Sequence, residues 1–245
     1  YTYNYVDCAA NPFVWVYTQT VDLTTMPTEV GGPVATSAAA TVDCQVDAVA
    51  PVILPVIEDA CGNVLVPAAP VVGGTFDGCE GTVTYTYNYV DCAANPFVWV
   101  YTQTVDLPAV IMPGNDALQV ECLASAVEPA APVVIDACGN NLVAVITENT
   151  DPACEGDKIY TFTYTDCAGV QYVYTYTYII DILTTPVVPG NSGEALQCVS
   201  DIYVPVAPAV VDACGNVIVP VMTENATPVC TGDKIYTFTY TDCSG

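Results

Sequence analysis

The segment that decides the fold is KIYTFTYTDCAGVQYVYTYTYII, residues 158–180. Residues 158–166 alternate aromatic and threonine side chains, and residues 171–180 alternate in the same way. A period of two indicates β-strands with different environments on their two faces, and the Asp-Cys-Ala-Gly segment between the strands is typical of a hairpin turn. The face predicted to be buried carries Tyr160, Phe162 and Tyr164.

This hairpin recurs along the chain. Residues 85–107 read YTYNYVDCAANPFVWVYTQTVDL, and residues 1–23 repeat the same letters without a change. Corresponding cysteines recur after 84, 75 and 76 residues, which is the length of a domain. We therefore expect a piece of a longer protein, with the final hairpin of a preceding domain at 1–23, domains at 24–107 and 108–183, and at 184–245 a domain without its last strand.

Each repeat is predicted to be all-β. Short Val-rich runs precede the hairpin, for example at residues 133–137 and 142–148, and no segment shows the 3.6-residue period of a helix. About seven short strands separated by turn residues indicate an immunoglobulin-like β-sandwich. Pro-rich stretches between repeats are typical of stiff linkers, so tandem sandwiches in an extended rod are expected.

Composition excludes several functions. The chain has 2 Lys+Arg against 27 Asp+Glu, no His, and a formal net charge of −25. Such a surface repels nucleic acid and anionic membranes, so we expect neither nucleic-acid binding nor direct membrane insertion. Without His, no His-dependent triad is possible, and no phosphate-binding glycine motif is present. We expect no enzymatic activity.

Thirteen cysteines indicate an oxidising, extracellular location. Zinc and iron–sulfur sites are disfavoured because the chain has no His and no Cys-x-x-Cys pair. Each repeat carries four cysteines, here called first to fourth, and Cys8 is the fourth cysteine of the preceding domain. The three sets are Cys44, Cys61, Cys79, Cys92; Cys122, Cys138, Cys154, Cys167; and Cys198, Cys214, Cys230, Cys243.

Four cysteines allow three connectivities, which sequence alone does not settle. The expected strand directions place the second and fourth cysteines at one end of a domain and the first and third at the other. Two disulfides inside each domain are therefore predicted. The predicted pairs are Cys44–Cys79, Cys61–Cys92, Cys122–Cys154, Cys138–Cys167, Cys198–Cys230 and Cys214–Cys243.

Acidic residues flank the second and fourth cysteines, and in a head-to-tail array acidic loops would converge at each junction. Carboxylate and amide oxygens suit Ca²⁺, so a calcium site at these loops is one hypothesis. The alternative is that Asp before Cys forms hydrogen bonds within its own turn. The candidate ligands are Asp59, Asn63, Asp91, Asp136, Asn140, Asp166, Asp212, Asn216 and Asp242.

The chain resembles the hyalin-repeat-like, immunoglobulin-like domains of long cell-surface proteins of Bacteroidota, including gliding-motility adhesins. The resemblance rests on the DACGN turn, on Cys-x-Gly before an aromatic and threonine strand, and on the TYTDCAG hairpin turn. It implies a secreted array of sandwich domains, and it supplies no catalytic residues.

These observations predict a structural and adhesive protein at a bacterial cell surface, whose repeats form a stalk or filament. The expected partners are neighbouring repeats of the same chain. An array of carbohydrate-binding modules, with surface glycans as partners, is one alternative. A self-polymerising fibre, with other copies as partners, is another.

Overall fold

The computed structural model describes residues 1–31 and 39–245. Its regular structure is strand, apart from three single turns of 3₁₀ helix, η1 (Gln45–Asp47), η2 (Leu123–Ser125) and η3 (Val199–Asp201). No helix among the described residues is long and apolar enough to cross a membrane. The chain divides into two compact units, Tyr1–Pro108 and Ala109–Gly245.

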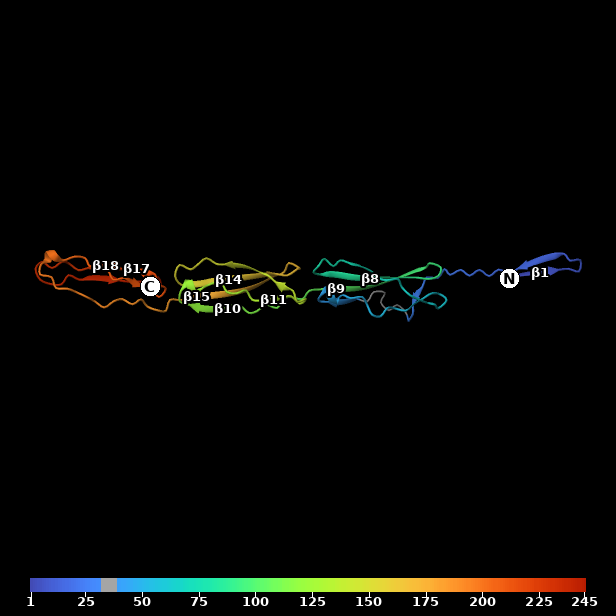
Figure 1. Ribbon diagram of the computed structural model, residues 1–245, viewed down its shortest axis with the longest axis horizontal. Coiled ribbons are helices and arrows are strands. Elements are labelled where there is room, and N and C mark those ends of the chain that lie inside the picture. The colour runs from blue at the N-terminus through green and yellow to red at the C-terminus, as the bar shows by residue number, and fades with distance from the viewer. Residues whose placement is uncertain (32–38) are drawn as a thin grey trace. The chain divides into compact units, whose positions relative to one another are not determined.

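The first unit begins with an isolated hairpin. Strands β1 (Thr2–Val6) and β2 (Pro12–Val16) pair antiparallel, with Thr2 opposite Val16 (Figure 1). Every residue of both strands is exposed, although the same letters form a half-buried hairpin in the repeat that follows.

The repeat that follows is built on a four-stranded sheet in the order β4-β9-β8-β7. A small three-stranded sheet in the order β3-β5-β6 accompanies it. The long hairpin β8–β9 supplies the centre, with ten residues in each strand. The strands are β3 (Thr28–Glu29), β4 (Ala39–Val42), β5 (Ile57–Glu58), β6 (Val64–Leu65), β7 (Val71–Gly74), β8 (Gly81–Val90) and β9 (Pro96–Val105).

The second unit contains the other two repeats. In the second repeat the order β10-β15-β14-β13 reproduces the four-stranded sheet, with a short ribbon β11–β12 beside it. The long hairpin of this repeat was predicted correctly from its alternating pattern. The strands are β10 (Asp116–Val120), β11 (Val134–Ile135), β12 (Asn141–Leu142), β13 (Ala144–Glu148), β14 (Gly156–Thr165) and β15 (Gln171–Ile180).

The core of the second repeat is the aromatic face of its hairpin. Phe162 and Tyr164 are 0% and 1% exposed, and Phe162 contacts Tyr174 at a ring-centroid distance of 5.7 Å. The Tyr164 hydroxyl donates to the carbonyl of Pro132 at 2.6 Å, which gives this buried polar group its partner. The predicted assignment of this face to the core is confirmed.

The third repeat has fewer strands. They are β16 (Val210–Val211), β17 (Val217–Ile218), β18 (Val221–Glu224) and β19 (Tyr236–Thr239). In place of a four-stranded sheet, β18 pairs only with β19. The position that β10 holds in the second repeat corresponds to residues 192–196, which form no strand.

The all-β class and the tandem β-sandwich-like repeats agree with the sequence. Two parallel pairings were not foreseen: β10 with β15, with Asp116 opposite Tyr176, and β4 with β9 in the first repeat. A parallel partner cannot be joined by a tight turn, so the hairpin signals that revealed the other strands could not reveal it. The extended-rod arrangement stays a prediction.

Candidate functional site: the cysteine junction between repeats

The second cysteine of each repeat lies in a preformed turn. In the third repeat, the Asp212 carboxylate accepts hydrogen bonds from the backbone N–H of Cys214 at 2.9 Å and of Asn216 at 2.8 Å. Its other oxygen accepts from the Asn216 side-chain amide at 2.9 Å. Gly215, at φ +84°, takes the left-handed conformation that closes the turn. The DACGN motif thus holds its cysteine in one place.

The fourth cysteine occupies the turn of the hairpin. In the second repeat the Asp166 carboxylate accepts from the backbone N–H of Val170 at 2.8 Å, and Gly169 is at φ +82°. In the third repeat the Asp242 carboxylate accepts from the backbone N–H and the hydroxyl of Ser244, at 3.1 Å and 2.7 Å. Both turns use an aspartate directly before the cysteine.

The first and third cysteines lie at the other end of the repeat. Cys122 follows β10 and directly precedes η2, and Cys154 lies in the loop between β13 and β14. Neither position has the Asp-Cys turn, so each cysteine is placed by the strand next to it.

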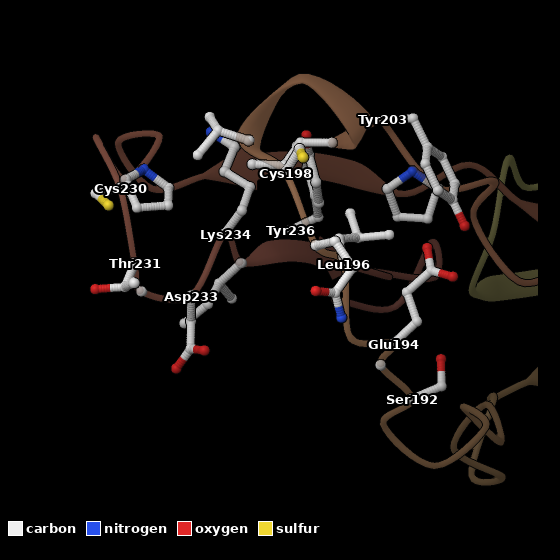
Figure 2. Close-up of a pocket in the computed structure, with 18 residues that line it drawn as sticks. Ser192, Glu194, Leu196, Cys198, Tyr203, Cys230, Thr231, Asp233, Lys234 and Tyr236 are labelled. Atoms are coloured by element: carbon white, nitrogen blue, oxygen red, sulfur yellow. The ribbon is translucent and has the colours of Figure 1, made fainter.

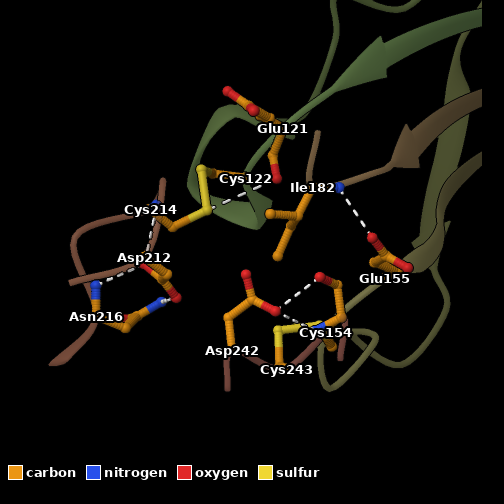
Figure 3. Close-up of a disulfide and its surroundings, with 11 residues drawn as sticks. Glu121, Cys122, Cys154, Glu155, Ile182, Asp212, Cys214, Asn216, Asp242 and Cys243 are labelled. Carbon is orange, nitrogen blue, oxygen red and sulfur yellow. Dashed lines mark hydrogen bonds between the residues drawn. A yellow bond between two sulfur atoms is a disulfide. The ribbon is translucent and has the colours of Figure 1, made fainter. Parts of the chain in front are cut away.

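Two disulfides join the second repeat to the third (Figure 3). Cys122 bonds to Cys214, with Cα atoms 5.5 Å apart, and Cys154 bonds to Cys243, with Cα atoms 5.7 Å apart. A first cysteine therefore bonds to the second cysteine of the next repeat, and a third cysteine to the fourth. Two disulfides thus link these repeats in addition to the backbone.

Side chains of the second repeat also anchor the linker. The Glu155 carboxylate accepts from the backbone N–H of Ile182 at 3.0 Å (Figure 3). The Glu121 carboxylate accepts from the backbone N–H of Thr184 at 2.7 Å. The hydrogen bond from Thr184 holds the pKa of Glu121 below its usual value. Each glutamate lies next to one of the bonded cysteines, so the linker is fixed beside both disulfides.

The predicted disulfides inside each domain are corrected by these bonds. Cys122–Cys154 and Cys214–Cys243 are wrong, because all four of these cysteines bond across the repeat boundary. Cys61–Cys92 and Cys198–Cys230 are also not formed, because these four are free thiols. Cys44, Cys79, Cys138 and Cys167 are disulfide-bonded. The pairs Cys44–Cys79 and Cys138–Cys167 stay predictions. The bonds Cys122–Cys214 and Cys154–Cys243 argue against them, because each of those bonds joins cysteines of different repeats.

The reason for the error is specific. Placing the first and third cysteines at one end was right, since Cys122 and Cys154 both reach the third repeat. Cysteines at a shared end can bond either to each other or to the end that faces them. The calcium hypothesis assumes that the ends of neighbouring repeats face each other. The same assumption, applied to the cysteines, predicts disulfides between repeats.

The hydrogen bonds inside the turns do not favour the calcium hypothesis. Both carboxylate oxygens of Asp59, Asp136 and Asp212 already accept hydrogen bonds within their own turns. No group of three or more Cys, Asp or Glu suited to a metal ion occurs among residues 1–31 and 39–245. Calcium stays a prediction, tested by a thermal scan in EDTA and then in excess Ca²⁺. The candidates held in such turns are Asp59, Asn63, Asp91, Asp136, Asn140, Asp166, Asp212, Asn216 and Asp242.

These turns make the protein sensitive to acid. The Asn216 side-chain amide and backbone N–H hold the pKa of Asp212 below its usual value, and Asn63 does the same for Asp59. A lowered folded-state pKa gives stability that is present above the unfolded pKa of about 3.9 and is lost as the pH falls through the folded value. Urea unfolding should therefore show a steep loss of stability below about pH 4.

The Asp212→Asn variant should be less stable at neutral pH and should lose less on acidification. Asn keeps an acceptor for the backbone N–H groups but carries no charge to be neutralised. The exposed Asp22→Asn change is the control. An identical pH profile for Asp212→Asn and the unchanged chain would contradict a role for this carboxylate.

Comparison with known proteins identifies the repeat. The family model of the HYR-like domain with 4 cysteines matches residues 33–105, 110–180 and 186–245. Each matched stretch contains one complete set of first to fourth cysteines. No curated protein matches the chain.

Proposed function

Because the chain belongs to the family of HYR-like domains with four cysteines, we propose that it forms a load-bearing part of the stalk of a bacterial cell-surface adhesin. Repeats of this family are typically non-catalytic structural or adhesion modules, and disulfide-rich repeats indicate an extracellular protein. The stalk role is supported above all by the two disulfides that tie one repeat to the next.

The disulfides limit how far the chain can extend under tension. If the second and third repeats unfold under load, the shortest covalent path from Cys122 to Cys243 runs through Cys214 and contains 29 residues of backbone. At roughly 3.5 Å per extended residue this path is about 100 Å long. Without the disulfides, 121 residues lie between the same two points, and the extended length is about 420 Å. The junction therefore limits extension about fourfold.

Single-molecule force spectroscopy tests this role. Pulled through its ends, the oxidised chain should release about 100 Å between residues 122 and 243, and about 420 Å after reduction. Cys8→Ser, which removes a free thiol outside the junction, is the matched control. Equal release lengths with and without reductant would exclude a load-bearing junction.

Carbohydrate binding has less support. Stacking of a sugar needs an exposed aromatic face, and in the long hairpins β8–β9 and β14–β15 the tyrosines Tyr89, Tyr164 and Tyr178 are buried. Exposed aromatic side chains occur in the isolated hairpin β1–β2. Surface glycans as partners stay a prediction. A glycan array with the 245-residue chain separates the two functions, since a stalk segment binds none of the sugars.

A further inference from the structure

A buried lysine fixes the loop that carries Cys154. Lys158, in the first part of β14, is 4% exposed and is one of only two Lys or Arg residues in the chain. Its ammonium group donates to the Asp151 carboxylate. The same group lies 3.1 Å from the Glu148 carboxylate and 3.2 Å from the backbone carbonyl of Asn149. One side chain of β14 thus holds the end of β13 and the loop that follows it.

The contacts of the ammonium group compensate for its burial. Lys158 Nζ also lies 5.5 Å from the centroid of the Tyr160 ring, whose face attracts a cation. The side chains of Glu148 and Asp151 are 57% and 58% exposed, so water screens the charge–charge part of the two ion pairs. The hydrogen bonds from the buried amine are therefore the main contribution of Lys158 to the order of the loop.

Two further contacts restrict the loop. The Asn149 side-chain oxygen accepts from the backbone N–H of Ile159 at 2.7 Å, which ties the start of the loop to β14. At the end of the loop, Gly156 is at φ +135°, and a Cβ atom added to it would lie 3.3 Å from the Cβ atom of Pro152. Cys154 lies between Pro152 and Gly156, so the chain is fixed on both sides of the cysteine.

The third repeat contains an equivalent lysine with fewer partners. Lys234 follows Cys230 by four residues, which is the spacing of the lysine and the third cysteine in the second repeat (Figure 2). Lys234 Nζ lies 3.4 Å from the Glu224 carboxylate, but Thr227 stands where the second repeat has Asp151. Because Cys230 takes part in neither disulfide of the junction, Lys234 offers a matched control.

The first repeat holds the corresponding cysteine by other means. Val83 stands at the position of Lys158 and is part of a small apolar cluster. In this repeat the Asp77 carboxylate accepts from the backbone N–H of Cys79 at 3.0 Å, so the loop is closed by its own turn. The loop of the third cysteine is thus held in each repeat, and in the second repeat the lysine holds it.

We propose that Lys158 is a positioning residue for the Cys154–Cys243 disulfide. By fixing the loop, Lys158 keeps Cys154 close to Cys243 when the bond is reduced, which raises the effective concentration of one thiol at the other. The bond is then more resistant to reduction by small thiols. This proposal rests on the junction of the proposed function, but it concerns the redox equilibrium of one bond and not the force that the bond bears.

The equilibrium with glutathione tests this role in chains that keep only one of the two bonds. Reduction of a disulfide consumes two glutathione thiols and yields two cysteine thiols and one molecule of oxidised glutathione. In the C122S/C214S chain, Lys158→Met should lower the equilibrium constant for forming the remaining bond about tenfold, or about 30 mV. In the C154S/C243S chain, the same substitution should change the remaining bond by less than about twofold. Alkylation and peptide mapping measure both equilibria.

Two further variants separate positioning from general stability. Lys234→Met makes the same chemical change in the third repeat and should leave the equilibrium of Cys154–Cys243 within about twofold. Asp151→Ala removes an exposed side chain and should weaken the same bond as Lys158→Met. Trypsin has only two sites in the chain, after Lys158 and after Lys234, so cleavage reports the opening of each loop separately. Asp151→Ala should speed the cut after Lys158 alone.

Three results would overturn the proposal. They are an unchanged equilibrium of Cys154–Cys243 in the Lys158→Met chain, an equal shift of Cys122–Cys214, and an equal effect of Lys234→Met. None of these measurements applies a force to the chain. Failure of the positioning role is therefore distinguished from failure of the load-bearing role, which force spectroscopy tests.

Discussion

Replacing Cys154 and Cys243 by serine should lower the free energy of unfolding of the second unit by about 3–4 kcal/mol. The bond closes a loop with a sequence separation of 89, and its loss returns chain entropy to the unfolded state. Urea unfolding of the oxidised chain, followed by far-UV circular dichroism, measures the change. Cys8→Ser, which removes a free and exposed thiol, should leave the midpoint where it is.

Removing the second bond as well should have a somewhat larger effect than the first. While Cys122–Cys214 is intact, it already shortens the loop that Cys154–Cys243 closes, so the two contributions are not additive. A variant without either bond should lose somewhat more than twice the single loss. A single variant no less stable than Cys8→Ser would mean that these bonds do not form in solution.

Phe162→Ala should destabilise the second repeat by about 3–5 kcal/mol, since it empties the site of a completely buried aromatic ring. Phe162 lies at the centre of the hairpin core, opposite Tyr174 in the strand register. Hydrogen exchange of β14 and β15 measures the loss. The corresponding amides in β8 and β9 serve as an internal reference, because the first repeat has a separate core that the substitution does not change.

The matched control is Thr163→Ala, one residue along β14 on the opposite face. Thr163 is half-buried outside the aromatic core, so its change should cost roughly 0.5 kcal/mol. Similar losses for the two variants would contradict the assignment of faces that the alternating sequence predicted.

How much of the structure can be predicted from the sequence depends on how far apart in the chain the interacting residues lie. The hairpin of residues 158–180 was predictable because alternation and turn chemistry are local, and burial then follows from the period of two. The turn role of Asp212 was one of two stated alternatives, and the structure shows hydrogen bonds to both of its oxygens. Local rules of this kind say where a residue lies within its repeat.

The contacts that escaped prediction are those between distant elements. The parallel pairing of β10 with β15 joins residues about 60 positions apart, and no turn motif marks it. Likewise, local sequence placed Cys122 at the correct end of its repeat but carried no information on whether Cys154 or Cys214 would be its partner. That choice depends on how two repeats face each other, which a single repeat does not contain.

The disulfides across the repeat boundary have a further consequence, which concerns damage. A protease that cuts the linker once, at any bond between Thr184 and Gly193, leaves the two fragments joined at Cys122–Cys214 and Cys154–Cys243. Either bond alone is enough to hold them, so the fragments part only when both have been reduced. The junction therefore survives any single chemical lesion, whether to its backbone or to one of its sulfur bridges, and such fault tolerance suits a protein that cannot be repaired after it leaves the cell.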